Sequence, residues 1–163
     1  MMATPAIGAE PLPTADELQQ QGEAVLALID QNLWMANRGL YGEKVSRGPL
    51  EPACMWSCGV QLSALNAAAR LDRNVYSKRL IDYADALQVY WKEHAGISGY
   101  DVLPAPTPPD RYYDDNVWIA LGLIELYELT GEQRWLDRAE ETLRFVYSGE
   151  DGKLDGGLYW RER

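Results

Sequence analysis

Cysteine and histidine are scarce in this sequence. Its 163 residues include two cysteines, Cys54 and Cys58, and one histidine, His94. Two cysteines cannot form the disulfide framework of a small secreted domain, and with one histidine they do not supply the ligands of a typical zinc site. We therefore expect no metal site and interpret both cysteines as free core thiols. His94 falls near the end of an expected helix, where it would interact with the helix dipole.

Long apolar runs and an excess of positive charge are also lacking. No stretch is long and apolar enough to span a membrane. Residues 1–13 contain neither the basic segment nor the apolar core of a signal peptide, so we expect either a cytoplasmic protein or a chain that lacks its secretion signal. Acidic residues outnumber basic ones by 25 to 15, and the net charge of −10 argues against nucleic acid or an anionic membrane as a partner.

Phenylalanine is nearly absent, whereas the other aromatic residues are abundant. The chain has ten tyrosines and six tryptophans against one phenylalanine. Tyrosine and tryptophan combine a flat apolar face with a polar edge, which suits both half-buried helix packing and stacking against sugars. Composition alone leaves both interpretations open.

Hydrophobic periodicity predicts an all-α protein with five helices and no strand. The expected ranges are about 14–37, 53–71, 75–93, 115–129 and 133–147, and the first opens on a capping box at residues 14–17. Residues 1–13 hold three prolines and a glycine and are expected to form a loose arm, which leaves 14–163 as one domain. The ranges 53–71 and 115–129 are apolar on nearly every side, which is typical of buried helices, and the other three are amphipathic.

The expected helices therefore alternate between outer and inner positions, as in an array of antiparallel α-hairpins. Connections from an outer to an inner helix are long, and those from an inner to an outer helix are short. A weak repeat supports the array, because Tyr76 and Trp135 are 59 positions apart (135 − 76), and the same offset relates Leu62 to Leu121. In such an array the long connections and the N-termini of the inner helices lie at one end.

Three segments are expected to converge at that end: residues 54–56, 112–116 and 155–160. Two adjacent carboxylates, Asp114 and Asp115, lie in the second of these segments. One interpretation makes them a helix N-cap and a first-turn charge favoured by the helix dipole. The other is a sugar-cleaving site, because two acids meet several aromatic residues there without a set of metal ligands.

Several motifs support the second interpretation. Residues 112–118 (YYDDNVW), 120–123 (ALGL) and 127–131 (YELTG) resemble bacterial members of glycoside hydrolase family 76. That family comprises endo-α-1,6-mannanases built on an (α/α)6 barrel. Residues 155–160 (DGGLYW) are similar to the family's Gly-Gly-Ile-Trp-Trp segment, with Tyr159 where tryptophan is common. The resemblance covers about residues 18–163.

The resemblance implies a retaining hydrolysis of α-1,6-mannosidic bonds in an oligo- or polysaccharide, with Asp114 as nucleophile, Asp115 as acid/base and no cofactor. Retention requires carboxyl groups roughly 5–5.5 Å apart, which adjacent residues can meet. The helix dipole would favour an ionised Asp114, and repulsion from that charge would keep Asp115 protonated. Candidates to line the sugar subsites are Trp56, Tyr112, Tyr113, Asn116, Trp118, Tyr159 and Trp160.

The sequence departs from the family in the extent of its barrel. The family barrel needs six hairpins, whereas five helices are predicted here, so we expect about half of an (α/α)6 barrel. Three explanations fit a half barrel: the chain is a fragment, its reading frame is truncated, or it is a protomer whose partner completes the ring. The open edges of a half ring would expose apolar faces, so we expect self-association or marginal stability. The alternative function is a non-catalytic helical module that binds a glycan or another protein.

Overall fold

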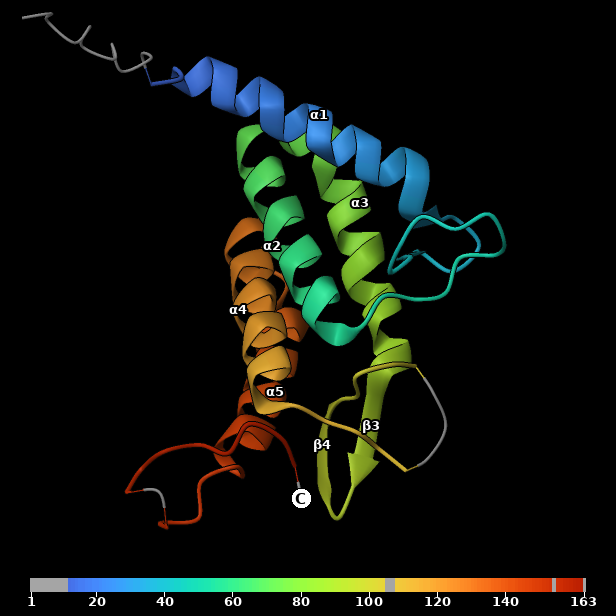
Figure 1. The fold of residues 1–163 in the computed structure, drawn as a ribbon. Helices are drawn as coiled ribbons and strands as arrows, with labels where there is room; N and C mark the ends of the chain where they lie inside the picture. The colour runs from blue at the N-terminus through green and yellow to red at the C-terminus, as the bar shows by residue number, and fades with distance from the viewer. Residues whose placement is uncertain (1–11, 105–107, 154, 163) are drawn as a thin grey trace, which may run out of the picture.

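The structure is an array of helices with two small β-hairpins (Figure 1). The computed structural model describes residues 12–104, 108–153 and 155–162. The helices are α1 (Ala15–Leu33), α2 (Met55–Leu71), α3 (Arg73–Ala86), α4 (Tyr113–Thr130) and α5 (Gln133–Tyr147), with a 3-10 turn η1 (Leu87–Tyr90) after α3. The strands are β1 (Trp34–Met35), β2 (Leu40–Tyr41), β3 (Trp91–His94) and β4 (Ile97–Tyr100). Each of the five predicted helices is present, in the predicted order.

Helices α2 and α4 pack against each other, and α3 and α5 pack against them as their hairpin partners (Figure 1). Leu62 on α2 and Ile119 and Leu123 on α4 are at most 1% exposed and lie in the main core. The prediction that both helices are buried on every side was too strong. Val60 is 50% and Leu121 49% exposed, so the two helices share an open apolar face.

The capping box at the start of α1 is confirmed. The Thr14 hydroxyl accepts a hydrogen bond from the Glu17 N–H (3.3 Å), and the Glu17 carboxylate accepts one from the Thr14 N–H (2.8 Å). These two bonds satisfy N–H groups that a helix start otherwise leaves unpaired. Of the predicted N-terminal arm, residues 1–11 lie outside the described residues, and Leu12 and Pro13 are exposed.

Helix α1 crosses the upper ends of α2 and α3 (Figure 1) and leaves an apolar groove beneath it. The groove has a volume of about 500 Å³ and is lined mainly by α1 and α2, including Leu18, Val25, Ala64, Ala67 and Leu71. Each residue of α1, all of them within the described part of the chain, keeps some solvent exposure. Across the described ranges, no helix is both long and apolar enough to cross a membrane.

The expectation that the chain forms no strand was wrong, because two antiparallel hairpins follow helices. Trp34 pairs with Tyr41 in the first, and Trp91 pairs with Tyr100 in the second. The second hairpin turns through Ala95 (φ 52°) and Gly96 (φ 79°), and two consecutive positive φ angles are typical of the tight type I′ turn.

These hairpins shorten two of the predicted helices. The first helix ends at Leu33 instead of residue 37, and the third changes to a 3-10 turn after Ala86 instead of continuing to residue 93. His94 therefore lies in β3, so its expected interaction with a helix C-terminus was wrong.

The internal repeat is present with two different offsets. The predicted offset of 59 holds for the outer helices, where Leu80 and Ala139 (139 − 80) are both buried. It fails for the inner helices, since Leu62 is buried and Leu121 is exposed. There the burial pattern matches at 61 positions (123 − 62), which pairs Leu62 with Leu123. The hairpins α2–α3 and α4–α5 are thus similar units with a two-residue shift.

Helix α4 approaches α2 closely at Gly122. A Cβ atom at this position would lie 2.5 Å from Leu62 Cδ2, and the Gly122 carbonyl accepts a hydrogen bond from Asn66 Nδ2 (2.9 Å). We expect Gly122→Ala to lower the free energy of unfolding by about 1–3 kcal/mol, because the added methyl group forces the helices apart. Urea denaturation measures this change.

The matched control is Gly22→Ala in α1, where an added Cβ meets no heavy atom within 4 Å. Alanine favours a helix over glycine by up to about 1 kcal/mol, so this variant should be as stable as the parent or more stable. Equal destabilisation by both substitutions would contradict the close contact at Gly122.

Candidate active site

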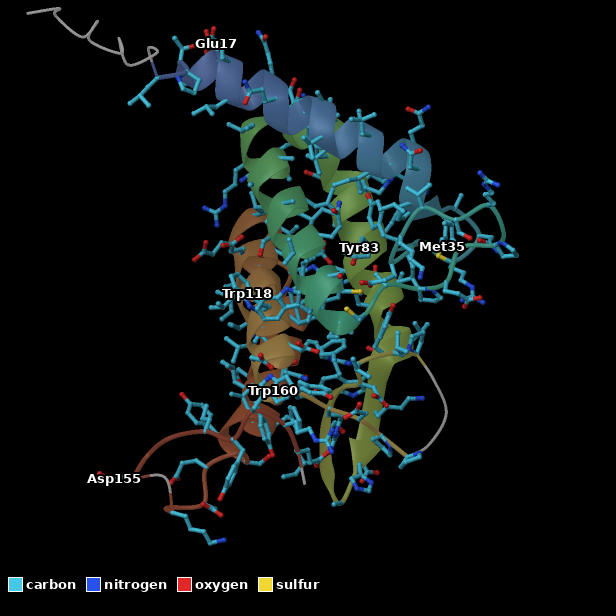
Figure 2. The ribbon with its side chains drawn as sticks, viewed as in Figure 1. Glu17, Met35, Tyr83, Trp118, Asp155 and Trp160 are labelled. Carbon is cyan, nitrogen blue, oxygen red and sulfur yellow. The ribbon has the colours of Figure 1, made fainter. Side chains whose placement is uncertain are left out.

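The N-terminal ends of α2 and α4 lie at one end of the array, where residues 160–162 run beside the start of α4. Figure 2 labels Trp160 beside the lower end of α4, where that helix begins. A hollow of about 250 Å³ lies here, lined by Cys54, Trp56, Val102, Tyr112, Asp114, Asp115 and Trp160. We call it the carboxylate pocket. The predicted convergence is confirmed for residues of 54–56 and 112–116 and for Trp160, whereas Asp155 lies away from the pocket (Figure 2).

Both aspartates lie in the first turn of α4, and neither is its N-cap. Tyr112 precedes the helix in an extended conformation (φ −112°, ψ 136°), and α4 begins at Tyr113. The interpretation of Asp114 or Asp115 as the N-cap was therefore wrong. The physical reason is that the Tyr113 N–H donates to the Trp160 carbonyl (3.0 Å), so a distant backbone segment satisfies the helix start.

Two hydrogen bonds orient the Asp114 carboxylate. Its Oδ1 accepts from the Asp115 N–H (3.0 Å), and its Oδ2 accepts from the Trp160 indole N–H (3.0 Å). The Trp160 ring also contacts Tyr112 edge to face, with ring centroids 5.1 Å apart. Hydrogen bonds to an ionised acceptor are stronger than neutral ones, so both bonds stabilise negative charge on Asp114.

Asp115 lies in a drier environment, because its side chain is 7% exposed. Burial, together with the negative charges of Asp114 and Asp110, raises the pKa of Asp115 to about 6. The N-terminus of α4 opposes this shift, since a helix dipole favours an anion there, so loss of water contact outweighs the dipole. Near neutral pH, part of the Asp115 population therefore keeps its proton.

The raised pKa gives a testable stability effect. A carboxyl group with a higher pKa in the folded than in the unfolded state binds more protons when folded, so the free energy of unfolding falls as pH rises from about 4 to 6. Asp115→Asn removes this cost and should raise the free energy of unfolding by roughly 1–2 kcal/mol at pH 7, with little gain at pH 4.

Urea denaturation of the parent and the variant at both pH values measures the difference. Asp137→Asn, on the exposed side of α5, is the matched control and should show no such pH dependence. If Asp115→Asn were less stable than the parent at pH 7, the ionised Asp115 carboxylate would not be a net cost to the folded state. That result would contradict the assignment of Asp115 as a buried acid with a raised pKa.

Trp56 and Trp118 flank the pocket on the open face of α2 and α4. Their rings lie edge to face with centroids 5.9 Å apart, and the side chains are 46% and 38% exposed. Trp56 lines the carboxylate pocket itself, together with Tyr112 and Trp160. Exposed indole and phenol rings beside an acid pair offer flat surfaces on which a sugar ring can stack.

Three other predicted site residues lie away from the pocket. Tyr113 is buried and stacks on Phe145 (centroids 4.8 Å apart). Asn116 is fully buried, accepts from the Tyr100 N–H (2.7 Å) and donates to the Tyr100 carbonyl (2.9 Å), so it joins β4 to α4. Tyr159 donates its hydroxyl hydrogen to Asp151 (3.0 Å). The structure thus brings Trp56, Tyr112 and Trp160 to the aspartates but not these three side chains.

The sequence analysis missed several residues around the site. Cys58 is a buried free thiol as expected, whereas Cys54 is half-buried and lines the pocket, so its assignment to the core was wrong. The Cys54 N–H at the start of α2 donates to Glu43 (2.7 Å), a partner from a distant loop that no local motif could have indicated. In the described part of the chain, no cluster of three or more His, Cys, Asp and Glu residues could hold a metal ion.

The fold is that of α-hairpin toroids. A sugar epimerase from a ruminal bacterium has a TM-score of 0.69 at 12% identity over 90% of this chain and 40% of its own, which shows the fold alone. The family follows from the sequence: the chain belongs to glycosyl hydrolase family 76, whose sequence model matches residues 22–163. A search of curated proteins gives no significant match.

Two solved structures of this family are similar. A GH76 α-mannanase from Bacteroides thetaiotaomicron is 31% identical with a TM-score of 0.79, over 88% of this chain and 40% of the mannanase. A family 76 mannosidase from the same organism is 25% identical with a TM-score of 0.78, over 89% of this chain and 41% of its own. The predicted family and partial (α/α)6 barrel are confirmed, and the chain spans about 40% of the length of these structures.

Proposed function

We propose that this chain carries the carboxylate pair of a glycoside hydrolase that cleaves α-mannan-like glycans at α-1,6-mannosidic bonds with retention of configuration. The observation that carries the proposal is the unequal environment of the two acids in one pocket. Asp114 accepts two hydrogen bonds, and the pKa of the buried Asp115 is raised to about 6. Two carboxyl groups held in different protonation states are what such a mechanism requires.

In the first step, protonated Asp115 donates its proton to the glycosidic oxygen. An Asp114 oxygen attacks the anomeric carbon, the bond to the leaving sugar breaks, and a glycosyl ester forms on Asp114. In the second step, Asp115 is ionised and takes a proton from water. That water attacks the anomeric carbon and releases Asp114 as a carboxylate, so both acids return to their initial states.

The aromatic side chains of the pocket would hold the substrate during these steps. Trp56, Tyr112 and Trp160 line the hollow, and their apolar faces fit the C–H faces of sugar rings. Trp118 lies beside Trp56 and would extend the binding surface along the open face of α4. We leave Tyr113, Asn116 and Tyr159 outside the proposed subsites because of their other contacts.

Hydrolysis of α-1,6-mannan, followed by release of reducing ends, tests the proposal. The chain is assayed alone and as a chimera in which residues 22–163 replace the matched segment of the Bacteroides thetaiotaomicron α-mannanase. We expect little or no turnover by the chain alone, because its mannanase relatives are more than twice as long. Turnover by the chimera supports the proposal. A folded chimera without activity on mannan contradicts it.

The second candidate is glycan binding without hydrolysis, which is favoured by the exposed side chains of Trp56 and Trp160 that line the pocket. Two results together would support this alternative: binding of manno-oligosaccharides to the chain in a calorimetric titration, and a folded chimera without activity. Self-association through the open edges of the half ring, or marginal stability, also stays a prediction.

A further inference from the structure

Arg111 is a buried cation that the proposed mechanism does not use. It is 1% exposed and lies three residues before Asp114, outside the carboxylate pocket. Burial of a charge is costly unless the charge is paired and its hydrogen-bond donors are satisfied. Its contacts therefore show which parts of the fold it holds together.

The Arg111 guanidinium joins three segments that are distant in the sequence. It forms two parallel bonds to Glu162, from Nε to Oε2 (2.8 Å) and from Nη2 to Oε1 (2.6 Å). Its Nη1 donates to the carbonyls of Lys92 (3.0 Å) and Ile97 (2.8 Å) in the β3–β4 hairpin. The guanidinium carbon also lies 4.6 Å from the centre of the Phe145 ring on α5. A planar fork of donors fits this geometry, and the point charge of a lysine does not.

The bond to Glu162 connects Arg111 to the carboxylate pocket. The Glu162 N–H donates to the Arg111 carbonyl (3.0 Å), and the Tyr113 N–H donates to the Trp160 carbonyl (3.0 Å). Residues 160–162 thus lie antiparallel to residues 111–113, with Tyr112 bridged to Arg161. This arrangement sets the Trp160 indole against Asp114 Oδ2.

Trp160 has little packing of its own to hold it there. Its side chain is 68% exposed, and its ring contacts the ring of Tyr112. The position of the indole therefore depends on how firmly residues 160–162 are anchored. The buried, bidentate ion pair at Glu162 is the strongest side-chain anchor of that segment in the described residues.

We propose that Arg111 is a positioning residue for Asp114. By holding Glu162, it seats residues 160–162 across the start of α4 and keeps the Trp160 indole N–H on Asp114 Oδ2. The carboxylate is then fixed by two donors, with Oδ1 on the Asp115 N–H. The catalytic consequence of this orientation rests on the proposed function, whereas the orientation itself can be measured without substrate.

Proton–nitrogen NMR of the tryptophan indole groups provides that measurement on the full chain. The chain contains six tryptophans, and Trp160→Phe identifies the Trp160 resonance. In the parent, this resonance should move when Asp114→Asn is introduced, since the acceptor of the indole N–H changes from a carboxylate to an amide. In Arg111→Lys and in Glu162→Gln the movement should fall by more than half, while the resonances of the tryptophans outside the pocket keep their positions.

Arg70→Lys is the matched control, because Arg70 forms an exposed ion pair with Glu128 (2.9 Å) on the inner helices. It should leave the Trp160 resonance and its response to Asp114→Asn unchanged. If Arg111→Lys does not fold, Glu162→Gln decides alone, because the Glu162 side chain is 22% exposed and the substitution keeps its size.

The proposal is overturned if Asp114→Asn moves the Trp160 resonance of folded Arg111→Lys or Glu162→Gln as far as that of the parent, since the backbone bonds of residues 160–162 would then suffice. It is also overturned if Asp114→Asn leaves the parent's Trp160 resonance in place. In an active chimera, Arg111→Lys should lower kcat more than it raises KM. An inactive chimera with a normal NMR result would reject the proposed hydrolysis and leave the positioning role supported.

Discussion

Asp114→Asn is expected to reduce turnover of mannan by the chimera by a factor on the order of 10⁴ or more. The substitution preserves the size of the side chain but replaces an anionic oxygen by a neutral amide, which cannot form the glycosyl ester. It also removes one of the two acceptor oxygens that hold the group, because an amide nitrogen donates and cannot accept from the Asp115 N–H or from the Trp160 indole N–H. An activated aryl mannoside should not restore activity, since no nucleophile is present.

Asp110→Asn is the matched control for this loss. Asp110 lies near enough to raise the pKa of Asp115, and it accepts a hydrogen bond from the Tyr112 hydroxyl (3.4 Å), but it does not line the pocket. The same change of charge and shape should leave turnover close to that of the parent. If Asp114→Asn kept near-parent activity, Asp114 would not be the nucleophile and would serve only as a charge in the first turn of α4.

Asp115→Asn should also lower turnover, but through loss of the general acid and base instead of the nucleophile. Loss of a general acid typically costs about 10²–10⁴-fold, and the cost depends on how much the leaving group needs a proton. We therefore expect a large loss with mannan and a much smaller loss in the first step with an activated aryl mannoside. Steady-state and pre-steady-state rates with leaving groups of graded pKa measure this dependence.

Added azide distinguishes the two roles further. In Asp115→Ala, a small anion can attack the glycosyl ester without help from a base, so azide should raise turnover and yield a glycosyl azide of retained configuration. Azide should have no such effect on Asp114→Ala. If the leaving-group dependence and the azide product with retained configuration appeared with Asp114 variants instead, the roles of nucleophile and acid would be exchanged.

The helical part of the fold could be predicted because it depends on local patterns. The apolar ranges around Leu62 and Leu123 and the capping box at Thr14 each act within a few residues, and all are present in the structure. The hairpin at Ala95 and Gly96 was missed because a positive φ at alanine has no reliable sequence signal. Aromatic residues at Trp91 and Tyr100 on either side of this turn were the available signal for strands.

The site was predictable only in part, for a similar reason. Convergence of Trp56, Asp114 and Trp160 followed from the alternation of inner and outer helices, which fixes where the long connections meet. The burial of Asn116 and the role of Arg111 depend on contacts with β4 and with Glu162, which are distant in the sequence. Such long-range pairings have no periodic signature, so the structure was needed to reveal them.

The most direct test of the account is to trap the covalent intermediate on the chimera. A mannosyl donor with fluorine at C2 and a good leaving group slows the second step more than the first, so a glycosyl ester accumulates. Trypsin cleaves after Arg111 and Arg134 and releases residues 112–134 as one peptide that contains both aspartates. The account predicts one added sugar on this peptide, located at Asp114 by fragmentation and absent in Asp114→Asn. An adduct on another residue of this chain, or an active chimera whose products have inverted configuration, would contradict it.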